Sequence, residues 1–204
     1  MSNKNPFLHG YYLTEELREM GFKYVGENVQ IAKNCTIIGL ENISIGDDTR
    51  IDGGVILACS NGVLKIGSYV HIAAKTCIWS AGGVTIQDFV GLSSGIKIYS
   101  ASDDYSGISL TNPTIPSEFQ TVINIAPVII GRHALIGCDT VILPGVTIEE
   151  GVSVGSKTLV NKSLDAWGIY AGIPAKRLKE REKYLLVLEK KLLESRDSPL
   201  PIIE

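Results

Sequence analysis

The sequence contains no long apolar run, which excludes a membrane-spanning helix of ordinary length. No stretch of the 204 residues approaches the roughly 18 apolar residues that a span requires. Residues 1–10 are polar and lack the apolar segment of a secretory signal, so we expect a cytoplasmic protein. Charge of one sign is not in excess either, because 19 basic and 22 acidic residues leave a net charge of −3. This balance gives no electrostatic basis for binding nucleic acid.

Cysteine is scarce and scattered. The four cysteines, Cys35, Cys59, Cys77 and Cys138, have neither disulfide nor metal-ligand spacing. We therefore expect them to act as small buried apolar residues in a reducing compartment. The chain is nevertheless long enough for one substantial core.

What the sequence does contain is a repeat of aliphatic residues at intervals of six. Eighteen positions carry it: Val25, Ile31, Ile37, Ile45, Ile51, Leu57, Ile66, Ile72, Ile78, Ile86, Leu92, Ile98, Ile130, Ile136, Ile142, Ile148, Val154 and Val160. A period of six matches neither the helical period near 3.6 nor strand alternation. We therefore predict an all-β solenoid, in which six residues make one short strand and a corner and three strands close a coil of roughly 18 residues.

Other positions of the repeat agree with a chain that turns a corner every six residues. Small or β-branched residues, such as Val29, Thr49 and Thr158, stand two positions before the aliphatic residue. Glycine often follows it, as at Gly46 and Gly137, where a tightly turning backbone favours this residue. Corner and side positions therefore both support the solenoid.

This pattern, over residues 25–178, resembles the hexapeptide-repeat family. The resemblance implies a left-handed parallel β-helix of about six coils. The left hand comes from the resemblance and not from the spacing, because crossovers between parallel strands are usually right-handed.

Three segments are predicted along the chain. Residues 1–24 form an N-terminal cap with a short helix at 11–21, whose N-cap is Thr14. Residues 25–166 form the β-helix, interrupted by a loop at 99–128. Residues 167–204 form a C-terminal segment with a charged, leucine-rich helix at 179–195 that serves as a cap or a subunit contact.

The loop at 99–128 is the longest departure from the repeat, which resumes in register at Ile130. Such loops on rigid supports are often functional, although a solvated surface loop would have a similar composition. The residues we expect to bind a polar substrate are Asp104, Tyr105, Ser106 and Asn112.

Two motifs resemble functional segments of the family. Residues 98–103 look like the segment that carries the catalytic histidine of sugar acetyltransferases, and residues 148–160 with 170–176 look like their acyl-coenzyme A site. The resemblance implies acetyl transfer from acetyl-CoA to a sugar, in a groove between the subunits of a homotrimer. The loop also looks like those of nucleotide-sugar and capsule or O-antigen acetyltransferases.

The chain departs from that pattern because Asp103 stands where the sugar O-acetyltransferases usually have histidine. A carboxylate is a poor base for a sugar hydroxyl at neutral pH, whereas an amine needs only to lose its ammonium proton. We therefore favour the amino group of a nucleotide-linked amino sugar as acceptor, with Asp103 orienting it or taking its proton.

Two alternatives remain open at this level. His71 precedes the inward Ile72 and should face outward, where it is either an ordinary surface histidine or a catalytic base for O-acetylation of a sugar hydroxyl. An inert β-helix that serves as a scaffold is the other alternative, and titration with acetyl-CoA would distinguish it.

For the acyl donor we expect Gly137, Ser156 and Thr158 to be outward positions along which the pantetheine arm lies. Lys176 and Arg177 would contact the phosphates, unless they are simply the basic start of the C-terminal helix. No metal is predicted, because a zinc site needs histidines converging at about 2 Å. His71 and His133 would lie two coils apart, roughly 10 Å by strand spacing.

Overall fold

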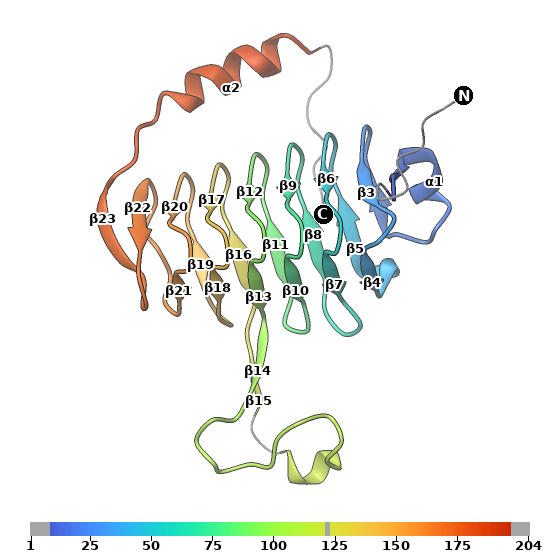
Figure 1. Ribbon diagram of the computed structural model, residues 1–204, viewed down its shortest axis with the longest axis vertical. Helices are drawn as coiled ribbons and strands as arrows, with labels where there is room; N and C mark the ends of the chain where they lie inside the picture. Colours follow the sequence, from blue (N-terminus) through green and yellow to red (C-terminus); the bar gives the residue numbers. More distant parts are fainter. Residues whose placement is uncertain (1–8, 121–122, 197–204) are drawn as a thin grey trace.

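The computed structural model describes residues 9–120 and 123–196, which form a three-sided parallel β-solenoid (Figure 1). Side A contains β1 (Tyr11–Leu13), β3 (Gln30–Ala32), β6 (Arg50–Ile51), β9 (His71–Ile72), β12 (Gly91–Leu92), β17 (Leu135–Ile136), β20 (Ser153–Val154), β22 (Gly168–Ala171) and β23 (Lys176–Glu180). Side B contains β2 (Tyr24–Val25), β5 (Ile43–Ile45), β8 (Leu64–Ile66), β11 (Val84–Ile86), β16 (Val128–Ile130) and β19 (Thr147–Ile148). Side C contains β4 (Thr36–Ile38), β7 (Ile56–Ala58), β10 (Cys77–Trp79), β13 (Lys97–Tyr99), β18 (Val141–Ile142) and β21 (Leu159–Val160).

The residues of the six-residue repeat stack in register inside the prism. Leu92 pairs in parallel with Ile72 on one side and Ile136 on the other, so the three stand in one column. All eighteen are buried except Ile37, which is partly buried in the first coil. The apolar core is thus one continuous column, and the predicted solenoid is confirmed.

The coil count differs slightly from the prediction. The six expected coils are present, and a partial seventh layer follows Val160. Leu164 bridges Ile148 in parallel, and β22 pairs in parallel with β20. The repeat of six does not reveal this layer, because Leu164 and Tyr170 do not continue the spacing.

At the N-terminal end, β1 pairs antiparallel with β3 and covers the edge of the first coil. The helix is shorter than predicted, since α1 spans only Thr14–Arg18. Thr14 is its first helical residue rather than its N-cap, and its hydroxyl accepts the Val29 N–H at 2.8 Å. The start of the predicted N-terminal cap, residues 1–8, lies outside the described residues.

The predicted loop projects from the prism as an arm (Figure 1). Its base is the antiparallel pair β14 (Ala101–Asp103) and β15 (Ile123–Ile125), and η2 (Ser117–Phe119) lies near its end. The arm leaves after β13 of side C and the chain returns to β16 of side B. It therefore belongs to the corner between sides C and B.

The C-terminal helix is also shorter than predicted, since α2 spans only Leu185–Glu194. The residues that precede it form β23, which pairs antiparallel with β22, because this edge of side A offers unpaired backbone groups. From there α2 runs back along the prism, and Arg196 after it bonds Asp48 at 2.7 Å (Figure 1). The end of the predicted C-terminal segment, residues 197–204, lies outside the described residues.

A stack of three rings supports α2 at the corner between sides B and A. Tyr69, Phe89 and His133 have positive φ of 57°, 59° and 61°, an uncommon conformation for bulky residues. Their ring centroids are 4.6 Å and 5.1 Å apart in successive pairs. The stacked rings therefore offset part of the backbone strain and give α2 an aromatic surface to cover.

Candidate active site

A groove runs along the outward face of side A, and we call it the side A groove. Its floor is the column of residues that precede the inward repeat positions, here His71, Gly91 and Leu135; Arg50 continues this column one coil before His71 but lines neither cavity. Two cavities of about 560 and 330 Å³ lie along it and share His71, Gly91 and Leu135 as lining residues. Gly91 has no side chain, so it leaves a notch between His71 and Leu135.

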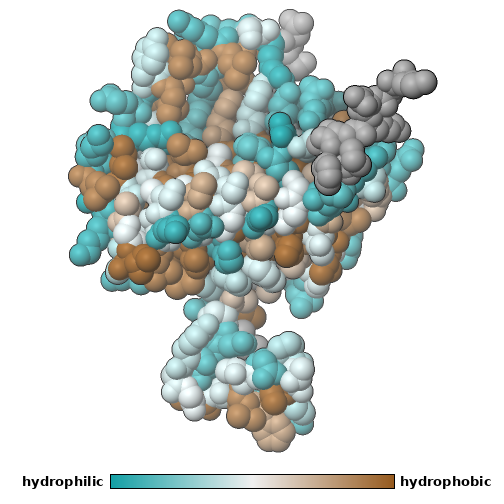
Figure 2. Space-filling view, viewed as in Figure 1, coloured by the Kyte–Doolittle hydropathy of each residue, from teal (hydrophilic) through white to brown (hydrophobic). Residues whose placement is uncertain are grey.

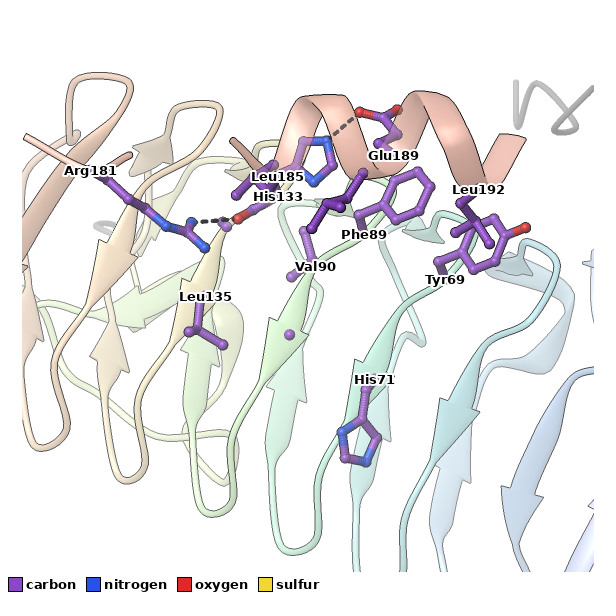
Figure 3. A pocket seen from close by; sticks show the side chains of 13 residues that line it. Tyr69, His71, Phe89, Val90, His133, Leu135, Arg181, Leu185, Glu189 and Leu192 are labelled. Carbon is purple, nitrogen blue, oxygen red and sulfur yellow. Dashed lines mark hydrogen bonds and ion pairs between the residues drawn. The ribbon is translucent and has the colours of Figure 1, made fainter. Parts of the chain in front are cut away.

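One wall of the groove is α2 (Figure 3). Leu185, Leu188 and Leu192 line the larger cavity opposite the ring stack. The Glu189 carboxylate lies 2.7 Å from His133 Nε2 and also forms an ion pair with Arg132. Burial would raise the pKa of Glu189, but these two partners together lower it below its ordinary value.

Arg181 fixes the segment that leads into α2. Its guanidinium donates to the carbonyl of His133 at 2.7 Å and to that of Gly151 at 3.1 Å (Figure 3). Burial lowers the pKa of this arginine. His133 is thus covered by α2, rather than exposed as its corner position would suggest.

The other wall is the corner between sides A and C. Ala73, Ser93, Ser94 and Cys138 line the smaller cavity there, below His71 and Leu135. These side chains are short, so the corner leaves room for a ligand. Cys138 is exposed, and only Cys59 is fully buried, so the expectation that all four cysteines are buried is wrong.

His71 faces outward, as predicted, and belongs to a polar cluster on successive coils. Its Nε2 lies 2.8 Å from Asp52 Oδ2, and Asp52 Oδ1 accepts from Arg50 Nε at 2.8 Å and Tyr11 Oη at 3.0 Å. Burial would raise the pKa of Asp52, but the hydrogen bonds from His71, Arg50 and Tyr11 together lower it. Asp52 is therefore an anion that orients its three neighbours.

Asp103 does not meet His71 within one chain. It is exposed on β14, in the arm at the corner between sides C and B, whereas His71 lies on side A. The two predicted catalytic residues thus come together only if the arm of one copy reaches the groove of another.

The four predicted substrate-binding residues lie in the arm, but most of their polar groups hold the arm itself. Asp104 accepts from the backbone and hydroxyl of Ser106 at 2.8 and 2.6 Å, and from Ile108 N at 2.9 Å. These hydrogen bonds lower the pKa of Asp104 to about 2. Asn112 Oδ1 bonds Thr114, and Tyr105 alone of the four projects almost fully into solvent.

The predicted CoA residues divide into exposed and buried ones. Ser156 is exposed at the corner between sides A and C, but the outward position predicted for Thr158 is wrong. Thr158 is buried, and its hydroxyl donates to Gly155 O at 2.7 Å and accepts from Gly172 N at 3.2 Å. Gly137 serves the stacking of coils, because a Cβ there would lie 2.5 Å from Ser156 N.

Lys176 and Arg177 lie on β23 and not at the start of a helix. Arg177 donates to Tyr170 Oη at 3.1 Å and pairs with Glu180 at 2.7 Å. Lys176 is exposed beside it. Both basic side chains stand at the C-terminal end of side A.

Ser93, Ser94, Leu135 and the Asp52 cluster were not predicted from the sequence. Alignment of the coils on the repeat would have found them, because Arg50, His71, Gly91 and Leu135 occupy equivalent positions. Within residues 9–120 and 123–196, no three His, Cys, Asp or Glu side chains gather as metal ligands would. The helices in this part of the chain are all too short or too polar to cross a membrane.

Stacked six-residue repeats, an arm and an outward groove are the features of the hexapeptide-repeat transferases. Residues 127–162 match the family described as bacterial transferase hexapeptide (six repeats). A dTDP-4-amino-4,6-dideoxy-D-glucose acyltransferase of Escherichia coli is 44% identical over 87% of this chain and 93% of its own. The chain therefore belongs to the hexapeptide-repeat acyltransferases, as the resemblance in the sequence implied.

Solved structures agree with this assignment. AntD, an N-acyltransferase of Bacillus cereus in complex with dTDP and 3-hydroxybutyryl-CoA, is 41% identical with a TM-score of 0.88, covering 93% of this chain and all of that one. Other AntD structures carry substitutions of a serine and an aspartate that lie ten positions apart in its sequence. WbbJ of Escherichia coli K12, named for lipopolysaccharide O-acetyl transfer, is 31% identical over 69% of each chain.

Proposed function

We propose that this protein transfers an acetyl group from acetyl-CoA to the amino group of a dTDP-linked 4-amino-4,6-dideoxyglucose, for surface-polysaccharide synthesis. The 44% identical relative is named for this sugar, and one AntD complex holds the same nucleotide-sugar together with coenzyme A. Both substrates are cytoplasmic metabolites, so we place the enzyme in the cytoplasm. Membership in an acyltransferase family argues against the inert scaffold.

The observation that carries the proposed assembly of the active site is the separation of groove and arm within one chain. The groove lies on side A, and the arm leaves from the corner between sides C and B. In a cyclic trimer each copy presents the same two surfaces to its neighbours. We therefore propose a homotrimer in which the arm of one copy closes the groove of the next.

The end of the arm supports contact with another copy. Ile108, Leu110 and Phe119 are strongly exposed there, and Figure 2 shows apolar side chains gathered at this end of the arm. Exposed apolar clusters of this kind mark interaction surfaces. Asp103, nearer the base of the arm, would then face the small side chains of Ser93 and Ser94.

The proposed reaction is direct transfer. The neutral amine attacks the thioester carbon, a C–N bond forms, and the C–S bond breaks as the tetrahedral oxyanion collapses. Asp103 orients the acceptor and takes one proton from its ammonium form, which gives the neutral amine. The second proton, which the nitrogen loses after the C–N bond has formed, passes to the leaving CoA thiolate. Backbone N–H groups of the groove stabilise the oxyanion. Asp104 is unsuited to this role, because its low pKa leaves it a weak base.

The spacing of residues also supports Asp103. This chain has a serine ten positions before each of its arm aspartates: Ser93 before Asp103 and Ser94 before Asp104. AntD has the same interval between its substituted serine and aspartate. Because the Asp104 carboxylate already accepts hydrogen bonds from other residues of the arm, we propose Ser93 and Asp103 as the pair at the reacting amine.

On the donor side, the pantetheine arm would follow the corner between sides A and C past Gly137 and Ser156. Lys176 and Arg177 would meet the phosphates as charge-assisted contacts. Thr158 would act only by holding that corner, since its hydroxyl is already bonded inside.

The rival function is O-acetylation with His71 as base. It is favoured by the 31% identical WbbJ and by the contact between His71 and Asp52, which resembles a carboxylate orienting a basic imidazole. Acetyl-CoA supplied with a panel of dTDP-linked amino sugars and their hydroxyl analogues separates the two functions. We expect turnover with the amino sugars only, and turnover confined to hydroxyl sugars would contradict the proposal.

Asp103→Ala should lower kcat by about 100-fold or more, in the range typical of lost proton transfer, and leave acetyl-CoA binding unchanged. Glu118→Ala is the matched control, because Glu118 is another exposed acid of the same arm. Normal turnover by Asp103→Ala would end the assignment of Asp103.

A further inference from the structure

The polar cluster at the N-terminal end of the side A groove contains an arginine that takes no part in the proposed transfer. Arg50 Nε donates to Asp52 Oδ1 at 2.8 Å, its Nη2 donates to Tyr11 Oη at 3.0 Å, and its guanidinium lies 5.3 Å from the Tyr11 ring centroid. These two hydrogen bonds and the contact with the Tyr11 ring thus fix the long, flexible side chain of Arg50 in one orientation on the outward face of side A. Such fixing prepares a donor for a ligand.

The outer edge of this cluster is available. The side chains of Arg50 and His71 are 55% and 52% exposed, whereas that of Asp52 is 18% exposed. Among the described residues no group bonds Nη1 of Arg50 or Nδ1 of His71. A ligand in the groove therefore meets N–H donors first, with the carboxylate beneath them.

The cluster also lies at a suitable distance from the reacting amine. Arg50 and His71 are on successive coils, and Ser93 and Ser94, which line the smaller cavity together with His71, are on the coil after that of His71. Strands about 4.8 Å apart put Arg50 roughly 10 Å along the axis from the coil of these serines. A sugar ring with a phosphate ester covers a comparable length.

We propose that Arg50 and His71 bind the diphosphate of the nucleotide-linked acceptor, with Asp52 and Tyr11 as the residues that position them. This inference rests on the proposed function and extends it, because it assigns the nucleotide to the N-terminal coils. Arginine is well suited to the site, since its planar fork binds two phosphate oxygens at once. His71 is then a phosphate ligand rather than the base of an O-transfer.

Coenzyme A also contains a diphosphate, so the source must be distinguished. The proposed CoA residues Ser156, Lys176 and Arg177 lie at the C-terminal end of side A, several coils from Arg50. One groove can thus hold two diphosphates at opposite ends with the reacting groups between them. This arrangement favours the nucleotide-sugar as the ligand of Arg50.

Binding of dTDP and of acetyl-CoA, measured by calorimetry on the full chain, tests this assignment. Arg50→Gln should raise the Kd for dTDP by about tenfold or more, a loss typical of a charge-assisted contact, with the Kd for acetyl-CoA within about twofold of the wild type. KM for the nucleotide-sugar should rise with kcat little changed. Arg18→Gln is the matched control, because Arg18 is an exposed arginine that is paired with Glu27 and takes no part in the Asp52 cluster.

Several outcomes would overturn the assignment: a wild type that does not bind dTDP, an unchanged Kd in Arg50→Gln, or a weakened Kd for acetyl-CoA alone. If Arg50→Gln does not fold, Arg50→Lys keeps the charge but loses the fork and should weaken dTDP less. In the wild type, dTDP should also shift the imidazole NMR signals of His71. If dTDP binds through Arg50 but no acetyl transfer occurs, the proposed function fails and the diphosphate site remains.

Discussion

At the scale of single residues, adjacent carboxylates of the arm have different physical roles. Asp103 is exposed on β14, whereas Asp104 accepts hydrogen bonds from Ser106, Ile108 and Ser109 and is the centre of the turn. The sequence Asp103-Asp104 cannot distinguish them, because hydrogen-bond partners depend on how the turn folds. The predicted substrate-binding role of Asp104 therefore falls on a carboxylate that already accepts hydrogen bonds within the arm.

The low pKa of Asp104 predicts how the arm responds to acid. Because the folded arm lowers this pKa from 3.8 to about 2, its stabilisation is fully present above the unfolded value and is lost as the pH falls through about 2. The amide NMR signals of Ser106 and Ser109 should thus keep their neutral-pH positions at pH 4 and move between about pH 3 and 1. Asp104→Asn should make the arm more sensitive to proteolysis at neutral pH while the prism melts unchanged. Movement of those signals already near pH 4 would contradict this.

At the scale of elements, the sequence predicted the strands well because a single rule places them. The inward residue recurs every six positions, and its burial decides where each strand lies. The repeat also places Thr158 two residues before the inward Val160, at a corner position. Because corner residues at this position are buried, the burial of Thr158 could have been predicted from the sequence. The C-terminal helix was predicted too long because its first part pairs with β22, a tertiary contact that helical propensity does not encode.

Arg181 holds the segment that leads into α2, whereas Lys190 of α2 forms only an exposed ion pair with Glu194. Arg181→Ala leaves the carbonyls of His133 and Gly151 without this donor, which should cost about 1–3 kcal/mol in the local stability of β23 and α2. Hydrogen exchange of the α2 amides should become faster, while that of the inner coils changes little. The control is Lys190→Ala, an exposed residue of α2 that should change stability by less than about 0.5 kcal/mol. Equal effects of the two substitutions would show that Arg181 does not hold the helix.

At the scale of the whole molecule, the proposed sites lie on different sides and different coils of the prism. In this proposal, the corner residues determine where a ligand can lie, and the axial position determines which part of the ligand they meet. The proposed nucleotide contacts lie on early coils, the reacting amine near Ser93, and the CoA contacts on late coils. The sequence could not place the arm relative to the groove, because only the order of sides in space shows that they occupy different corners.

This separation predicts complementation between two inactive variants. Asp103→Ala removes the arm residue, and Gly91→Leu fills the notch of the groove floor, where an added Cβ would lie 3.0 Å from Leu135 Cδ1. Each alone should lose activity. When both chains are co-expressed and assembled at random, about a quarter of the sites should combine an intact groove of one copy with an intact arm of the next. The activity of the purified mixed assembly should therefore recover to roughly that fraction of the wild type.

Separately purified variants that are mixed without exchange of subunits are the control and should stay inactive. No recovery in the co-expressed protein would mean that arm and groove act within one chain, and the intersubunit site would then be wrong.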